Sequence, residues 1–213
     1  MAAIAFNPSK AVVFDLARGA VHVGGSSSTS SSSSPADGRG AAPSHVLVPA
    51  DLFATLVDHY AGSRTLGHTI GGDIARRAAA RIGQGSGTLR PPSAEPGRLR
   101  AVSLNEVVDL VGGELALLGL GSLRIERWGD AMLFALDPCA LDERADAFVE
   151  GIIEGILEVG GGRAAHAAVI DRTNDTARVL VAGAAAVERA RAMALVGTPF
   201  TEIVTELQEA RKP

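Results

Sequence analysis

Apolar residues recur with a helical period in several segments of the chain. In residues 148–157, FVEGIIEGIL, they lie three and four positions apart, which is typical of a helix with a face toward a core. The same pattern predicts helices from about residue 50, over 65–82, from 103 to about 118, over 142–158, and twice within 183–213. Ser103 and Glu106 have capping-box spacing, and Thr198 with Pro199 predicts the N-cap and first residue of the last helix.

Short β-rich runs predict the strands. Residues 11–15 and 20–23 flank a glycine turn and predict a hairpin, and a short strand precedes the helix at residue 50. Two alternating runs meet at a WGD turn, and a last hairpin is expected to turn at residues 173–176. Helices and strands come in blocks, so the predicted class is α+β, with helices packed on a small antiparallel sheet.

Two of the predicted helices contain glycines four residues apart. Gly67 and Gly71 interrupt the helix over 65–82, and Gly151 and Gly155 interrupt the helix over 142–158. A glycine inside a helix costs roughly 1 kcal/mol relative to alanine, and residues four apart lie on the same side of the helix. We therefore expect a neighbouring helix, the sheet or a second subunit to approach these backbones closely, and interpret both helices as packing or dimer surfaces.

The length of 213 residues suits a single domain, which we assign to residues 1–182, followed by a helical extension over 183–213. Residues 24–43 are rich in serine and residues 83–97 in glycine and proline, so both segments are expected to be flexible insertions. The serine-rich segment is best interpreted as a tolerated loop expansion, and phosphorylation there is the alternative.

Charge and cysteine content narrow the function classes. The formal net charge is −4 and the basic residues are scattered, which argues against a nucleic-acid partner. Cys139 is the only cysteine, so neither an internal disulfide nor a cysteine-rich zinc site is expected, and a reducing cytoplasm is favoured. No apolar run has the length of a membrane span, and no signal-peptide pattern opens the chain. We expect a cytoplasmic protein.

No group of residues forms a recognisable catalytic motif. The histidines at 22, 45, 59, 68 and 166 lack metal-ligand spacing, so no metal and no cofactor is predicted. His68 either faces a pocket or is a surface or satisfied core histidine. Glu150 and Glu154 lie four apart on one helical face, where acid/base chemistry is possible, but an exposed polar edge opposite the isoleucines is the preferred interpretation. No catalytic residue is assigned, and an enzyme is the less favoured class.

Basic and aromatic residues leave further alternatives open. Arg76, Arg77 and Arg81 are interpreted as a solvated helix face rather than an anion site. Trp128, the only tryptophan, lies in the WGD turn and either covers a core edge or anchors an interface. The last helix carries an apolar stripe that docks on the core of the same chain, the favoured option, or on a partner protein.

In their order, several pieces of the chain resemble the 4-vinyl-reductase domain family, which is related in fold to subunits of the TRAPP vesicle-tethering complexes. These pieces are FDLARGAVHVGG, HVLVPADLFATLVDHY, GHTIGGDIARRAAARIG, GLGSLRIERWGDAMLFALDP, ADAFVEGIIEGIL and ARVLV, which together span about residues 11–182. The resemblance implies a dimeric α+β module that binds small apolar or aromatic molecules in sensors and occurs beside tetrapyrrole chemistry. Members that bind metal carry a cysteine pair where this chain has Val169 and Ala177, so the resemblance implies no metal here.

The function expected from this resemblance is a non-enzymatic, homodimeric scaffold or adaptor in signalling that acts through a protein partner. The alternatives are a sensor domain for a small apolar molecule and an accessory protein or enzyme of tetrapyrrole metabolism. Candidate residues for the ligand pocket are His68, Phe134, Ile152 and Ile156. Candidate interface residues are Gly67, Gly71, Trp128, Gly151, Gly155, Phe200, Ile203 and Leu207.

Overall fold

The computed structural model describes residues 50–82, 97–129, 131–173 and 175–210, together with the backbone of strands β1 (Ala2–Ala5), β2 (Val12–Asp15) and β3 (Ala20–Val23). The described chain is α+β, with six α-helices packed on an open antiparallel sheet. β2 and β3 pair as the predicted antiparallel hairpin. The short strand expected before residue 50, the 24–43 insertion and all but the last residue of the 83–97 insertion lie outside the described residues.

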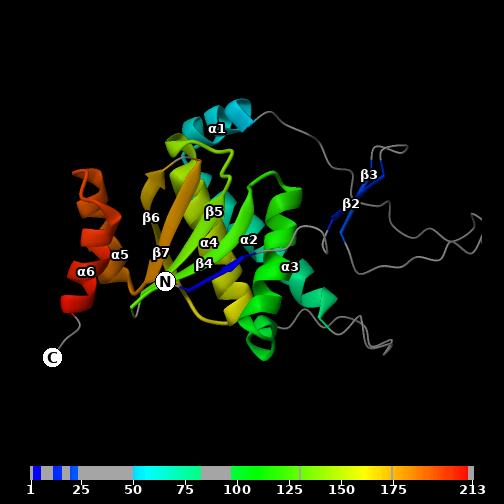
Figure 1. Ribbon diagram of the computed structural model, residues 1–213. Helices are drawn as coiled ribbons and strands as arrows, with labels where there is room; N and C mark the ends of the chain where they lie inside the picture. The colour runs from blue at the N-terminus through cyan, green and yellow to red at the C-terminus, as the bar shows by residue number, and fades with distance from the viewer. Residues whose placement is uncertain are drawn as a thin grey trace, which may run out of the picture.

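Four strands form the centre of the molecule, in the order β4, β5, β7, β6 (Figure 1). They are β4 (Ser122–Trp128), β5 (Ala131–Asp137), β6 (His166–Thr173) and β7 (Thr176–Ala182), and each neighbouring pair is antiparallel. The hairpins predicted around the WGD turn and residues 173–176 are therefore confirmed. β1 pairs with the outer side of β4 and was not predicted, because its short alanine-rich run carries a weak strand signal.

Helices cover both faces of this sheet (Figure 1). The six are α1 (Ala50–His59), α2 (Ser63–Arg81), α3 (Leu104–Leu117), α4 (Asp146–Gly161), α5 (Ala184–Leu195) and α6 (Phe200–Glu209). Two short 3-10 helices, η3 (Arg98–Ala101) and η4 (Glu143–Ala145), lead toward α3 and into α4. In Figure 1, α5 and α6 lie on one side of the sheet, α2, α3 and α4 lie on the other, and α1 lies across one end.

Alternation along the strands divides the apolar residues between these two sides. In β5, Phe134 and Leu136 belong to the main core with α2, α3 and α4, whereas Leu133 belongs to the second core with α5 and α6. In β6, Ala167 and Ala168 are divided in the same way. Because side chains alternate between the faces of a strand, a strand covered on both faces has a nearly continuous apolar run, as β5 does.

Local signals place the helices, but some boundaries differ: the helix predicted over 142–158 is α4 over Asp146–Gly161, preceded by η4. The Ser103 hydroxyl accepts a hydrogen bond from the Glu106 amide at 3.3 Å, as its spacing predicted for the start of α3. The predicted cap of α6 is wrong by one position, because Pro199 itself is the N-cap residue and the helix begins at Phe200 without a side-chain cap. Near boundaries, hydrogen bonding and packing shift a helix start by a residue without changing its face.

Candidate functional site

The four glycines of α2 and α4 face each other across a close helix–helix contact within one chain. A Cβ added to Gly71 would lie well under 3.0 Å from the Ile152 carbonyl oxygen, and one added to Gly155 would meet the His68 carbonyl oxygen in the same way. Gly67 and Gly151 make equivalent approaches to backbone carbonyls. The sequence left open whether a helix, the sheet or a second subunit approaches the glycines of α4. The structure shows that the helix α2 does so.

The close contact between α2 and α4 contributes stability that offsets the poor helix propensity of glycine. With no Cβ between them, the two backbones come close enough for Cα–H groups of one helix to contact carbonyl oxygens of the other. It also lets residues beside the glycines, such as Ile74 and Ile152, become fully buried. The crossing fixes α2 against α4 and so determines which side chains of both helices reach the sheet.

Glu150 and Glu154 are among the side chains so positioned, and they are buried. Their exposed fractions are 5% and 7%, so the expectation of an exposed polar edge is wrong. A helix whose other positions are glycine or large apolar residues has no wide polar side, which is typical of a buried helix. The pattern FVEGIIEGIL contains this signal, but it does not tell which groups neutralise the two charges.

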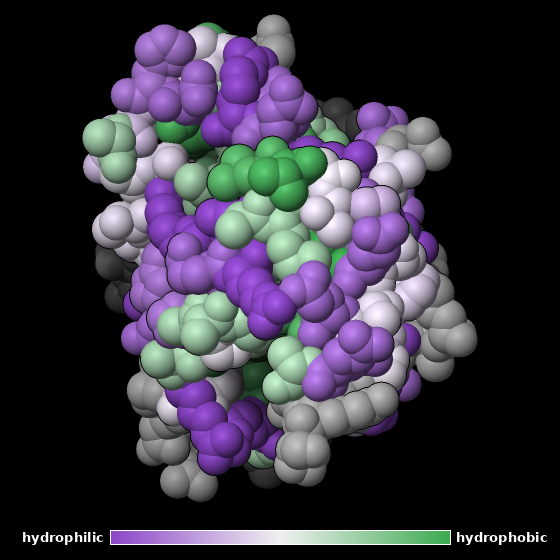
Figure 2. All heavy atoms as spheres, turned by 90° about the vertical axis from the view of Figure 1, so that its left-hand side faces the viewer, coloured by the Kyte–Doolittle hydropathy of each residue, from purple (hydrophilic) through white to green (hydrophobic). Residues whose placement is uncertain are grey.

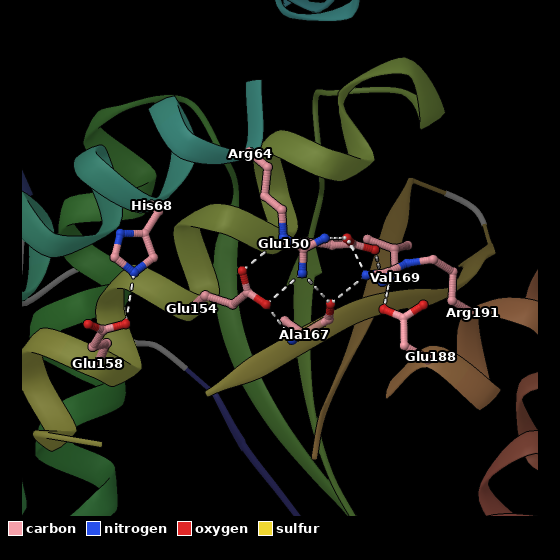
Figure 3. Close-up of polar contacts among 9 residues, drawn as sticks. All are labelled: Arg64, His68, Glu150, Glu154, Glu158, Ala167, Val169, Glu188 and Arg191. Carbon is pink, nitrogen blue, oxygen red and sulfur yellow. Dashed lines mark hydrogen bonds and ion pairs between the residues drawn. The ribbon is translucent and has the colours of Figure 1, made fainter. Parts of the chain in front are cut away.

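Arg64 of α2 and Arg191 of α5 neutralise them from opposite sides (Figure 3). The Arg64 guanidinium donates to both oxygens of Glu154, through Nη2 at 2.6 Å and Nε at 3.0 Å, and a further nitrogen donates to Glu150. Arg191 donates through Nη2 to Glu150 at 3.0 Å. A forked guanidinium contact of this kind has high geometric specificity. We call these four side chains the charged cluster.

The charged cluster also binds the backbone of β6, the last strand in the sheet order. Glu154 accepts a hydrogen bond from the Ala167 amide and Glu150 accepts one from the Val169 amide, each at 2.9 Å. The Ala167 carbonyl oxygen accepts from Arg64 and Arg191 at 3.1 and 3.2 Å. Edge strands expose unpaired backbone groups that can add a further strand. Here side chains from α2, α4 and α5 occupy that edge.

The Arg64 guanidinium remains charged in this setting. Burial lowers the pKa of Arg64, but the hydrogen bonds and negative charges of Glu154 and Glu150 outweigh burial, so its pKa lies above the ordinary value. Every carboxylate oxygen of Glu150 and Glu154 already accepts at least one hydrogen bond. A general acid or base needs a proton that can reach a substrate. The arrangement therefore favours a structural role for both carboxylates.

A second buried carboxylate connects α2 and α3. Glu114 forms ion pairs with Arg77, whose Nε lies 3.0 Å from Oε2, and with Arg81. The interpretation of Arg76, Arg77 and Arg81 as a solvated face is correct for Arg76, which is exposed and pairs with Asp73. It is incomplete for Arg77 and Arg81, because each neutralises a charge that α3 buries.

The four residues proposed for a ligand pocket do not lie together around an opening. Phe134, Ile152 and Ile156 are buried in the main core between α4 and the sheet. His68 lies on the rim of the α2–α4 contact, where its Nε2 is 3.1 Å from a Glu158 carboxylate oxygen and both side chains are partly exposed (Figure 3). His68 is therefore a surface histidine with a carboxylate partner.

The aromatic and apolar interface candidates near the C-terminus pack within the chain. Ile203 is buried in the second core, and Phe200 and Leu207 pack against that core while partly exposed. Trp128 meets Phe200 edge to face, with ring centroids 5.2 Å apart, and the Arg178 guanidinium lies 4.8 Å from the Phe200 ring centroid. The favoured docking of α6 on its own core and the covering of a core edge by Trp128 are both observed.

Cys139 lies in the main core, close to the start of α4. Its Sγ contacts the Leu141 carbonyl oxygen at 3.5 Å, and the Arg172 guanidinium lies 4.0 Å from the sulfur while also pairing with Asp146. A small cavity of about 250 Å³ lies beside these residues. Among the described residues, no group of histidine, cysteine, aspartate or glutamate side chains is arranged to hold a metal ion.

Among the described residues, the most exposed large apolar side chains lie on and directly after α1 and at the turn between α5 and α6. On α1, Phe53 and Val57 face the chain, whereas Leu52 and Leu56 point outward. At the turn between α5 and α6, Leu195 and Val196 are 82% and 80% exposed. Figure 2 views the α5–α6 side and shows hydrophobic residues at the surface among hydrophilic ones. Exposed patches of this kind commonly mark interaction surfaces.

A groove of about 710 Å³ lies between the α5–α6 hairpin and the sheet. Its walls come from the ends of β5 and β7, the first turn of α5 and the last turn of α6. Most of the described residues that line it are alanine or other apolar residues, with Arg189 and Gln208 as the polar members. Nothing in the sequence pattern indicated this groove, since it depends on how far the hairpin stands from β7.

Comparison with known proteins gives no assignment: no protein-family model matches the sequence, and no curated protein is significantly similar to it. Within the described part of the chain, no helix is both long and apolar enough to cross a membrane. The function must therefore be argued from the molecule itself.

Proposed function

We propose that the protein is a non-enzymatic, homodimeric scaffold or adaptor module that resembles 4-vinyl-reductase and TRAPP-like domains and acts in the cytoplasm. One observation carries the proposal, an apolar row formed by Leu52 and Leu56 on the outer side of α1 and by Tyr60 directly after it. Their exposed fractions are 51%, 58% and 54%. Residues four apart lie one above another on a helix, so Leu52 and Leu56 are neighbours on this side of α1, and Tyr60 follows the end of the helix.

This row has the properties of a self-complementary contact. α1 is fixed to the chain by its opposite side, where the Phe53 and Phe148 rings meet edge to face at 5.1 Å between centroids. A two-fold axis brings the same surface of each subunit into contact, so an apolar row on one subunit meets the same row on the other. Because the inner side of α1 is already packed, the row is the side of this helix that suits such a contact.

The partner-binding part of the proposal uses the exposed turn of the α5–α6 hairpin. The apolar stripe of α6 is turned toward the second core, so it does not offer a surface to another protein. Leu195 and Val196 instead project from the turn, away from the core. An adaptor needs two separate contact surfaces, and the row on α1 and this turn are separate elements of the chain.

The order of elements supports the 4-vinyl-reductase/TRAPP-like type. Helices α1, α2 and α3 precede the β4–β5 hairpin, then α4 and the β6–β7 hairpin follow, and this arrangement is of the α+β class that the resemblance implies. The glycine-bearing α4 lies against α2, so its small residues serve a helix–helix contact within the chain. The saturated charged cluster supports a structural rather than a catalytic use of the two carboxylates in α4.

The test is the mass of the native particle, measured by native mass spectrometry and light scattering. The wild-type protein should be a dimer, and Leu56→Glu should convert it to a monomer with an unchanged circular dichroism spectrum, because a charge in an apolar contact is costly. Leu104→Glu is the matched control, since Leu104 is also exposed, at 43%, but lies on α3. A monomeric wild-type protein would contradict the proposal.

A double variant, Leu195→Ser with Val196→Ser, separates the two surfaces. It should remain a dimer of unchanged mass, since the hairpin turn lies outside the α1 row. If this variant dissociated while Leu56→Glu stayed dimeric, the dimer contact would belong to the hairpin and the assignment of surfaces would be reversed.

A sensor for a small molecule is the second candidate function. The groove of about 710 Å³ beside α5 and α6 favours it, because ligand clefts in proteins commonly enclose about 300–1,000 Å³. The apolar and basic residues that line the groove point to one chemical class of ligand.

A further inference from the structure

The groove beside α5 and α6 has an apolar interior. Leu180 and Leu207 lie at its walls with Ala131, Ala182 and Ala186. These side chains cannot hydrogen-bond a ligand, so they favour a hydrocarbon or aromatic body by removing its surface from water. Small side chains also leave the space unfilled, which distinguishes this side of the sheet from the tightly packed α2–α4 side.

One end of the groove carries an arginine. Arg189 lines it, and no aspartate or glutamate occurs among its described lining residues. Arg189 also pairs with Glu206, but both side chains are about half exposed, at 51% and 42%. An exposed ion pair contributes at most about 1 kcal/mol. The guanidinium can therefore turn to an anion in the groove at small cost.

The backbone adds to this polarity at the same end. Gly183 and residues 184–186 line the groove as the N-cap and first turn of α5, and this turn has neither a side-chain cap nor an acidic residue. Amides of a first helical turn lack intrahelical partners and carry partial positive charge. They support an anion that the groove and Arg189 already favour.

We propose that this groove binds a small amphipathic anion, whose apolar body lies against Leu180 and Leu207 and whose anionic head lies between Arg189 and the first turn of α5. The proposal is independent of the adaptor function, because neither the α1 row nor the exposed turn at Leu195 and Val196 shares a residue with the groove. It deepens the sensor alternative by naming the ligand class and by moving the site from the filled core around Ile152 to the opposite side of the sheet.

A pair of fluorescent probes tests the ligand class directly. The probes are 1-anilinonaphthalene-8-sulfonate, which has an apolar body with an anionic head, and N-phenyl-1-naphthylamine, which has the same body without the charge. The full-length protein should bind one sulfonate per chain with a dissociation constant about tenfold below that of the neutral probe. Equal affinity for both probes would overturn the assignment of an anionic head.

Variants then locate the site. Arg189→Ala and Ala185→Asp should each weaken sulfonate binding about fivefold to tenfold and leave the neutral probe unaffected. An aspartate in the first turn of a helix favours the helix, so Ala185→Asp should fold normally. Arg76→Ala is the matched control, since Arg76 is an exposed arginine paired with Asp73 on α2. It should bind both probes as the wild type does.

Filling the groove gives the decisive outcome. Ala186→Trp should abolish binding of both probes while the circular dichroism spectrum is retained. Binding that survives this variant would show that the probes occupy another apolar surface, such as the α1 row, and would overturn the proposal. The oligomeric mass is measured on the same samples, so failure of the groove proposal is distinguishable from failure of the adaptor proposal.

Discussion

The two sides of the sheet are covered in opposite ways. On the main-core side, glycines let α2 and α4 approach until their backbones touch, and isoleucines fill the remaining space. On the other side, an alanine-rich α5 and a short α6 cover β6 and β7 but leave a groove at the end of the hairpin. Small residues thus have two effects. They permit backbone contact between α2 and α4, and they leave unfilled space between α5, α6 and the sheet.

What draws the helices together on the main-core side is the combination of apolar burial and the charged cluster. Arg64 reaches across from α2 to both carboxylates of α4, while Arg191 extends the cluster to α5. The cluster is therefore also the link between the two sides. Substitutions on the two sides of the sheet should therefore change the free energy of unfolding by different amounts and even in opposite directions.

The largest effect is expected from the charged cluster. Glu154→Ala leaves the Ala167 amide without its acceptor and removes one of the two carboxylate partners of Arg64, and loss of one member of a buried pair costs about 3–5 kcal/mol. Because Arg64 is partly exposed and can regain water, we expect about 3 kcal/mol, measured by urea unfolding. Glu158→Ala removes an exposed glutamate about one turn later in the same helix and should cost less than about 0.5 kcal/mol. Equal costs for the two variants would contradict the structural role.

The next effect is expected at the glycine contact. Gly71→Ala gains about 1 kcal/mol of helix propensity but forces a Cβ against the Ile152 carbonyl, so the net loss of stability should be about 2 kcal/mol. Gly161→Ala is the control, because nothing lies within 4 Å of its added Cβ. It should be neutral or slightly stabilising in the same thermal unfolding experiment. A stabilising Gly71→Ala would mean that α2 and α4 stand further apart than described.

On the groove side, enlarging a small residue should have the opposite sign. Ala186→Leu places apolar carbon in open space, so the free energy of unfolding should stay the same or rise by up to about 1 kcal/mol. Ala78→Leu, in the fully buried main core, should instead lower it by about 1–3 kcal/mol. Urea unfolding of the two variants measures this difference. A loss of stability in both variants would contradict the expected contrast between the two sides of the sheet.

The smallest effect is expected at the rim of the main-core side, where η4 begins. The hydrogen bonds and charge of Arg144 hold the pKa of Asp142 below its ordinary value. Since the folded-state pKa is the lower one, this carboxylate stabilises the fold above the unfolded-state pKa of roughly 4, and that contribution disappears as the pH falls through the folded-state pKa. Asp142→Asn should therefore show a smaller drop in melting temperature between about pH 5 and about pH 3. If the variant lost as much melting temperature as the wild type, groups other than Asp142 would cause the loss of stability in acid.

Particular elements show how far sequence reasoning reaches. The α3 start at Ser103, the β4–β5 hairpin and the turn before Thr176 follow from local signals, because capping, alternation and turn residues act within a few positions. The local pattern assigns Glu150 and Glu154 to solvent because their partners, Arg64 and Arg191, lie far away along the chain. No local pattern links residues at such separations.

The pocket residues illustrate the same limit. Ile152 and Ile156 are pocket candidates by sequence, yet both are buried in the main core. The groove escapes sequence reasoning because alanine-rich α5 carries no distinctive signal of its own. Whether small residues close a contact or open a cleft depends on the distance between elements, which is a property of the assembled fold.

The sequence by itself determined the α+β class, the order of the helices, the main hairpins and the need for something to pack against the glycines of α4, because periodicity and steric cost are local. Only the tertiary structure decided that α2 is that neighbour, that the α4 carboxylates close the β6 edge, and that a groove opens beside α5. Those outcomes depend on contacts between distant segments, whose energies appear only when the chain is folded.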